Sequence, residues 1–214
     1  GTNEINGLTL YSTMWYLMMA ETLELSRPRL SNAISEAVKD GSIAYTLCKP
    51  YDFLLYHYSS AIGETVFRSA MTALIGGTLA WFLVGAPPSA LGALAVLPVM
   101  LGAWTLNFCV SAIIGLSAFW VEDISAFQWI YQKLAFILGG LLIPLDFYPG
   151  WLQTTAKSLP FSAMTYGPAR VFVTPAPQIL FSTLVMQIAW MIALAALLAL
   201  IYRRSVAALT VNGG

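Results

Sequence analysis

The chain has 214 residues and a formal net charge of zero, with 9% charged and 58% apolar residues. Soluble domains carry about 25% charged and about 45–50% apolar residues, and the mean hydropathy here is +0.74. This composition excludes an ordinary soluble domain and, without a basic surplus, gives no support for a nucleic-acid partner. It indicates an all-α integral membrane protein, because lipid offers unpaired backbone groups no hydrogen-bond partner.

Five apolar segments are candidates for helices that cross the bilayer, which takes about 20 residues each. They cover residues 8–25, 66–85, 89–121, 134–145 and 179–202. Pro98 predicts a kink in the third segment, whereas the fourth is too short to cross cleanly and breaks at Pro144. We therefore predict a single polytopic helical domain over residues 1–214, with five spans, the penultimate one broken.

Between the first and second segments lies a polar connection, residues 26–65. Eleven of the twenty charged residues fall between Glu21 and Arg68. Apolar residues recur in this connection at helical spacing, at Leu30, Ala33, Ile34, Ala37 and Val38. The other face of this predicted helix carries Ser31, Asn32, Ser35, Glu36, Lys39 and Asp40. Gly41 is placed to end the helix, and a connection of this length with an amphipathic helix favours a docking surface over a solvated loop.

The distribution of lysine and arginine predicts the orientation of the spans. If the connections alternate across the membrane, eight of the ten basic residues lie on one side, and only Lys157 and Arg170 lie on the other. Because lysine and arginine are enriched on the cytoplasmic side of membrane proteins, the polar connection and the C-terminus are predicted to face the cytoplasm. The first segment then enters from outside without a signal-peptide pattern, so we expect one further span before it, six in all.

The region after the fourth segment, residues 146–178, is predicted to lie outside the membrane. Pro144 and the turn Tyr148-Pro149-Gly150 interrupt the helix. Residues 151–159 are then expected to form a short amphipathic helix, with Leu152 and Leu159 on its apolar side and Lys157 toward water.

Catalytic and metal-binding patterns do not occur in the sequence. It contains neither a phosphate-loop motif nor HExxH. Cys48 and Cys109 lie in different settings without metal-ligand companions, and His57 lies between two tyrosines, as is typical of a residue at the membrane interface. We therefore predict no catalytic residue, metal or cofactor in this chain.

Charged and polar residues near the spans leave two alternatives open. Glu21 and Glu24 are interpreted as end-of-span residues that pair with Arg27 or Arg68, with a proton relay as the alternative. Asn107 needs a hydrogen-bond partner in lipid, so it faces another helix or a substrate path. Other acidic residues fall at span ends and are interpreted as interfacial: Glu122, Asp123 and Asp146.

Two stretches resemble the membrane subunits of type-2 ABC exporters, which move drugs, lipids and polysaccharides outward. In "KDGSIAYTLCKP" the matching residues are Gly41-Ser42-Ile43, Leu47 and Pro50. The segment "GGLLIPLDFYPGWLQTTAKSLPFSAMTYGPARVF" is similar to the short, broken penultimate span of that family and its external helix, with Pro144, Pro149, Trp151, Pro160 and Phe161 in the expected order. The tail "LTVNGG" is similar to the end of one subgroup. Together, the order of these motifs makes the resemblance cover essentially the whole chain, minus the further span expected before it.

This resemblance implies a bacterial plasma-membrane permease that pairs with a second copy or a related permease. The polar connection is then a coupling helix that contacts a separate ATPase subunit, and that subunit holds ATP and Mg²⁺. The implied contact residues on this chain are Ser31, Asn32, Ser35, Glu36, Lys39, Asp40 and Gly41. The candidate residues of a substrate path between the two permeases are Trp104, Asn107 and Trp151. An ion-coupled secondary transporter or a membrane-embedded enzyme is the alternative, and a scaffold that docks a cytosolic protein is a third possibility.

Overall fold

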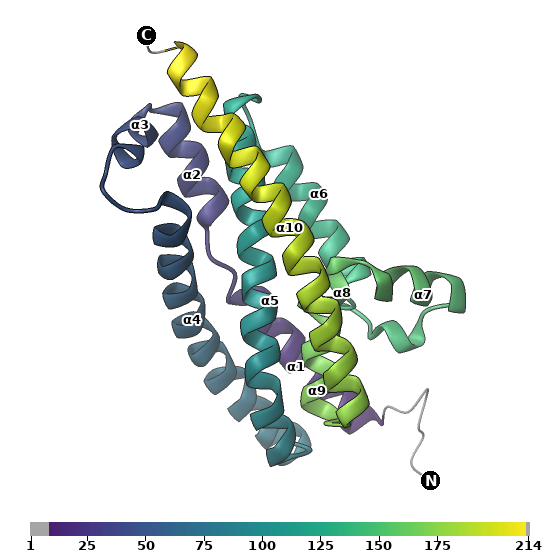
Figure 1. Cartoon of the computed structure of the whole chain (residues 1–214). Coiled ribbons are helices and arrows are strands. Elements are labelled where there is room, and N and C mark those ends of the chain that lie inside the picture. Colours follow the sequence, from purple (N-terminus) through teal and green to yellow (C-terminus); the bar gives the residue numbers. More distant parts are fainter. Residues whose placement is uncertain (1–8, 213–214) are drawn as a thin grey trace.

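The computed structural model describes residues 9–212, which form helices joined by turns, without a strand in that range (Figure 1). Three of these helices are long and apolar enough to cross a membrane: α4 (Phe53–Val84), α5 (Ala90–Leu116, continued by a 3₁₀ turn, Ser117–Phe119) and α10 (Pro177–Asn212). The predicted all-α fold is therefore confirmed for the described residues, and three of their helices are candidate spans by length and composition.

Helix α5 is the centre of the bundle. About half of the residues in its most apolar stretch are buried, compared with 11% in the corresponding stretches of α4 and α10. It packs against α10, α2, α9 and α8. Ser89 caps its first turn by accepting a hydrogen bond from the amide of Gly92 at 3.2 Å. Pro98 lies inside this helix, as the sequence predicted.

Helix α4 begins earlier than its predicted start at residue 66. The Asp52 carboxylate accepts a hydrogen bond from the amide of Leu55 at 2.7 Å and caps the helix at Phe53. Residues 53–65, expected as part of the polar connection, therefore form the first turns of a long helix. The helix ends where predicted, at Gly85, whose φ of +106° no β-branched residue adopts readily.

Helix α1 (Leu10–Leu25) has 16 residues and packs against α4 and α9. Thr9 and Ser12 form a capping box at its first turn, which fixes the start of the helix. The first residue of the predicted segment, position 8, lies outside the described residues. Helix α1 is shorter than the three long helices, so on length alone it does not qualify as a span.

The predicted fourth segment, residues 134–145, is displaced in the structure. Helix α6 (Ser125–Leu138) begins earlier and ends before Pro144 is reached. Gly140 has a φ of +70°, and the amides of Gly140 and Leu141 donate to the carbonyls of Ile137 and Phe136. This is a Schellman motif, so a glycine ends the helix where the sequence analysis assigned that role to proline.

After α6 the chain folds through short elements before α10 begins. They are a 3₁₀ turn, Leu145–Phe147, and the helices α7 (Gly150–Ser158), α8 (Pro160–Met164) and α9 (Tyr166–Val173). The predicted helix at 151–159 is confirmed by α7, which projects from the side of the bundle (Figure 1). Helices α8 and α9 return to pack against α5 and α10.

Helices α2 (Leu30–Lys39) and α3 (Ser42–Leu47) lie at the end of the bundle where α10 finishes (Figure 1). Leu30, Ile34 and Ile43 are buried in a cluster that also contains residues of α4, α5 and α10. These short helices are therefore fixed to the bundle by their apolar side.

Candidate functional site

The turn between α2 and α3 has the geometry that its sequence predicted. Gly41 adopts a φ of +76° directly after Asp40, the last residue of the α2 cap. The Asp40 carboxylate accepts a hydrogen bond from the amide of Ser42 at 2.9 Å. Hydrogen bonding by the Ser42 side chain, and then by its amide, lowers the pKa of Asp40 below its usual value. Glu36, Lys39 and Asp40 are exposed, so the end of α2 presents a charged surface.

Helix α2 is rotated slightly from the orientation that the pattern predicted. Ser35, predicted on the outward face, is only 4% exposed, whereas Ala33, predicted on the apolar stripe, is exposed. Helix α2 packs closely on α5, where a Cβ at Gly115 would lie 2.9 Å from the Cβ of Ile34. Ser35, next to Ile34, is buried and is not free to meet a partner.

Ser31 and Asn32 are directed toward another helix of the same chain. The amide of Gln128, in α6, donates hydrogen bonds to Ser31 Oγ at 2.9 Å and to Asn32 Oδ1 at 2.5 Å. These hydrogen bonds could not be predicted from local sequence, because Gln128 lies 97 positions from Ser31 and 96 from Asn32. The proposed docking helix is thus bound to α6 as well as seated on α5.

Helix α3 adds an aromatic residue that the sequence analysis did not select. Tyr45 is 73% exposed, and the ammonium of Lys49 lies 5.1 Å from the centre of its ring. Exposed tyrosines with adjacent charge are common at protein interfaces. The candidate surface therefore consists of five exposed residues of α2, α3 and the turn between them: Glu36, Lys39, Asp40, Gly41 and Tyr45. We refer to it as the α2–α3 surface.

A second polar network joins α1, α5 and α6 below this surface. Glu24 pairs with Arg27 at 2.5 Å, as one predicted alternative stated, and the Arg27 guanidinium lies 5.0 Å from the centre of the Tyr131 ring. Tyr131 donates to Asn107 Oδ1 at 2.6 Å. Asn107 therefore has the interhelical hydrogen bond expected of a polar residue in lipid. Because Glu24 is paired with a cation, this arrangement gives no support to a proton relay.

The three candidate path residues are not brought together. Trp104 lines a groove of about 550 Å³ with residues of α1, α4 and α9, and its indole N–H has no partner among the described residues. Asn107 is buried, one turn further along α5, in the network described above. Trp151 is 73% exposed on α7, which projects from the bundle. A shared role for these three residues stays a prediction.

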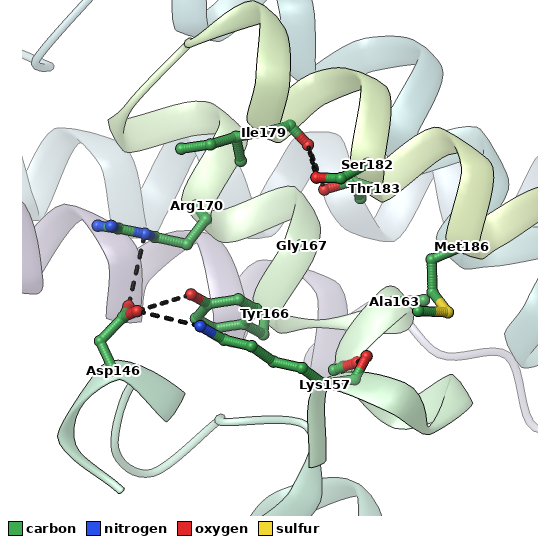
Figure 2. A pocket seen from close by; sticks show the side chains of 11 residues that line it. Asp146, Lys157, Ala163, Tyr166, Gly167, Arg170, Ile179, Ser182, Thr183 and Met186 are labelled. Atoms are coloured by element: carbon green, nitrogen blue, oxygen red, sulfur yellow. Dashed lines mark hydrogen bonds and ion pairs between the residues drawn. The ribbon is translucent and has the colours of Figure 1, made fainter. Parts of the chain in front are cut away.

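A charged cluster that the sequence analysis did not identify surrounds Asp146. Lys157 Nζ lies 3.5 Å from Asp146 Oδ1, Arg170 Nε lies 3.4 Å from Asp146 Oδ2, and the Tyr166 hydroxyl donates to Oδ1 at 2.8 Å (Figure 2). Asp146 was expected as an ordinary residue at the end of a span, but its side chain is only 10% exposed. The chain brings these residues from three separate elements, so no local spacing could have revealed the cluster.

No group of three or more potential metal ligands is gathered in the described part of the chain. Cys48 is exposed and Cys109 is buried, and the imidazole of His57 packs edge-on to the ring of Phe53. The histidine and cysteine side chains are therefore placed as packing and surface residues.

A sequence model of the family described as "ABC-2 family transporter protein" matches residues 1–213 of the chain. Comparison with curated proteins and with solved structures returns no match. The matched range contains both the α2–α3 surface and the cluster around Asp146, so both features belong to one family domain.

Proposed function

The chain belongs to the ABC-2 family of transporter proteins and is a transmembrane subunit of an ABC transporter, and we propose that it serves ATP-driven export with an ATPase subunit docked on the α2–α3 surface. This surface is the observation on which the proposal depends. It is charged, exposed and outside the three candidate spans. A second permease chain completes the substrate path, and Trp104, Asn107 and Trp151 remain its candidate lining residues.

We propose that α1 and α6 complete five spans together with α4, α5 and α10. At 1.5 Å per residue, the 16 residues of α1 extend about 24 Å, somewhat less than a hydrocarbon core of about 30 Å. Helix α6 has 14 residues and is too short to cross by itself. Helices α8 and α9, packed against α5, would fill the remaining depth as the returning part of a broken span.

The proposed orientation places the α2–α3 surface and the C-terminal end of α10 in the cytoplasm of a bacterial cell. It follows from the excess of lysine and arginine on that side. Helix α7 and the cluster around Asp146 then lie toward the outer side. ATP and Mg²⁺ are expected on the partner subunit, because this sequence has no phosphate loop.

The contacts of α2 supply a route by which ATPase closure could reach the path. A displacement of α2 would act on α5 through Gly115 and Ile34, and on α6 through the hydrogen bonds of Gln128. Helix α6 leads into the broken span and α7. We propose that ATP-driven movement of α2 shifts these helices and alternately opens the path.

Charge reversal at the α2–α3 surface tests the docking proposal. We expect Glu36→Lys combined with Lys39→Glu to reduce the ATPase that co-purifies with the chain about tenfold, a change of about 1.4 kcal/mol. Neither residue lies in a candidate span, so membrane insertion should be unchanged. The amount of retained ATPase and its rate of hydrolysis are the measurements.

The control reverses another charged pair, which lies within the candidate span α4, so its membrane insertion is measured as well. Glu64 and Arg68 form an ion pair at 2.6 Å within α4, and Glu64→Lys with Arg68→Glu restores that pair in reverse. The control should retain the ATPase. If both double variants retain it equally, with unchanged hydrolysis and export, Glu36 and Lys39 do not form the docking site.

A further inference from the structure

The cluster around Asp146 forms one side of a cavity of about 410 Å³ between α7, α8, α9 and α10. Lys157 and Arg170 both face a single carboxylate, so these three side chains carry a net positive charge. Arg170 and Asp146 are 14% and 10% exposed, so water screens this ion pair poorly, and the remaining positive charge lies on the more exposed Lys157. Such a site favours an additional anion.

Lys157 is the cation best placed to meet a ligand. Its side chain is 40% exposed, and its 3.5 Å separation from Asp146 Oδ1 is long for a charge-assisted hydrogen bond. The ammonium also lies 5.0 Å from the centre of the Tyr166 ring. The indole N–H of Trp190, in α10, donates to the carbonyl of Ser158 at 3.1 Å and so holds the end of α7 at the cavity.

The other side of the cavity combines apolar side chains with the hydroxyl groups of Ser182 and Thr183. Ala163, Ile179 and Met186 contribute to its lining, and Figure 2 shows Ala163 and Met186 on the side opposite Asp146 and Arg170. Beyond Met186, helix α10 carries large exposed apolar side chains, among them Ile188 and Ile192. A ligand that fits both sides has a charged end and an apolar chain.

We propose that this cavity binds the headgroup of an anionic amphiphile, with a phosphate or carboxylate at Lys157 and Arg170. The apolar chain would extend past Met186 along α10. This goes beyond the proposed export function, and binding requires neither the ATPase nor transport. A failure of binding is therefore distinguishable from a failure of ATPase docking.

The experiment is calorimetric titration of the full chain, purified in a neutral detergent, with dioctanoyl phosphatidylglycerol. Dioctanoyl phosphatidylcholine has the same chains without net charge, and glycerol 1-phosphate has the anion without chains. We expect phosphatidylglycerol to bind about tenfold more tightly than either, because a charge-assisted hydrogen bond and the apolar contacts each contribute.

Variants test whether the named residues form this site. We expect Lys157→Gln to weaken binding of phosphatidylglycerol about tenfold. Asp146→Asn should strengthen binding, because it removes the competing carboxylate and keeps an acceptor for Tyr166. The control is Lys133→Gln, in α6, where the ammonium lies over Trp129 and outside the cavity lining.

Three results would overturn the proposal. The first is that monodisperse Lys157→Gln binds phosphatidylglycerol as tightly as the unmutated chain. The second is that the unmutated chain binds phosphatidylglycerol and phosphatidylcholine equally tightly. The third is that it binds phosphatidylglycerol and glycerol 1-phosphate equally tightly. The last would indicate a site for free anions. Lys157 is partly exposed, so Lys157→Gln should fold and decides the question even if Asp146→Asn does not.

Discussion

The α2–α3 surface and the cluster around Asp146 use charge in opposite ways. Glu36 and Lys39 are exposed and form no ion pair in the described part of the chain, so their charges are available to another molecule. Asp146 forms ion pairs with Lys157 of α7 and Arg170 of α9, and its side chain is largely buried. The first arrangement suits a soluble partner, and the second fixes the broken span while leaving a surplus of positive charge.

The two regions also differ in what positions them. Helix α2 is held by side-chain packing on α5 and by the hydrogen bonds of Gln128. The segment from the 3₁₀ turn to α9 is held by charged groups that converge on one carboxylate (Figure 2). Removal of a single charge should therefore disturb the second region far more than the first.

The largest effect is expected for Asp146→Ala. It leaves Lys157 and Arg170 without their shared carboxylate, and loss of one partner from a poorly solvated ion pair costs about 3 kcal/mol. Thermal unfolding of the purified chain should shift down by several degrees. Glu122→Ala, at an exposed glutamate, is the control and should unfold like the unmutated chain. Equal melting of both variants would show that the cluster does not stabilise the fold.

A smaller effect is expected for Gly41→Val. A Cβ at this position meets nothing within 4 Å, so the cost comes from the φ of +76°, about 1–2 kcal/mol for a residue with a side chain. The turn should be displaced and ATPase retention should fall. Gly41→Asn should retain most of the ATPase, because asparagine tolerates this conformation. Equal loss with both variants would mean that the glycine acts through something other than its backbone conformation.

The smallest effect on stability is expected for Gln128→Leu. Loss of the hydrogen bonds to Ser31 and Asn32 should cost about 1 kcal/mol. The ATPase should still dock, whereas the export achieved per ATP hydrolysed should fall. Gln132→Leu, one turn further along the same helix, is the matched control. If the two variants export equally well, α2 does not act on α6 through Gln128.

The contrast explains how far the sequence could predict this molecule. Apolar periodicity and Gly41 gave the boundaries of α2, because both are local signals. The burial of Ser35 could not be foreseen, since α2 packs against residues of α5 that are remote in sequence, such as Gly115 next to Ile34. The Asp146 cluster draws on residues up to 24 positions apart in separate elements, and its geometry follows from how α7, α8 and α9 fold back. Its charges could be predicted, but their convergence could not.

The most direct measurement of the central claim is which side of the membrane each region faces. Cys48 is exposed at the end of α3, and Cys109 is buried. A membrane-impermeant maleimide, added to intact spheroplasts, should not label Cys48 but should label Lys157→Cys in a Cys48→Ser chain. Inside-out vesicles should reverse this pattern. Labelling of Cys48 from outside without lysis would contradict the proposed orientation, and with it the docking of a cytoplasmic ATPase on the α2–α3 surface.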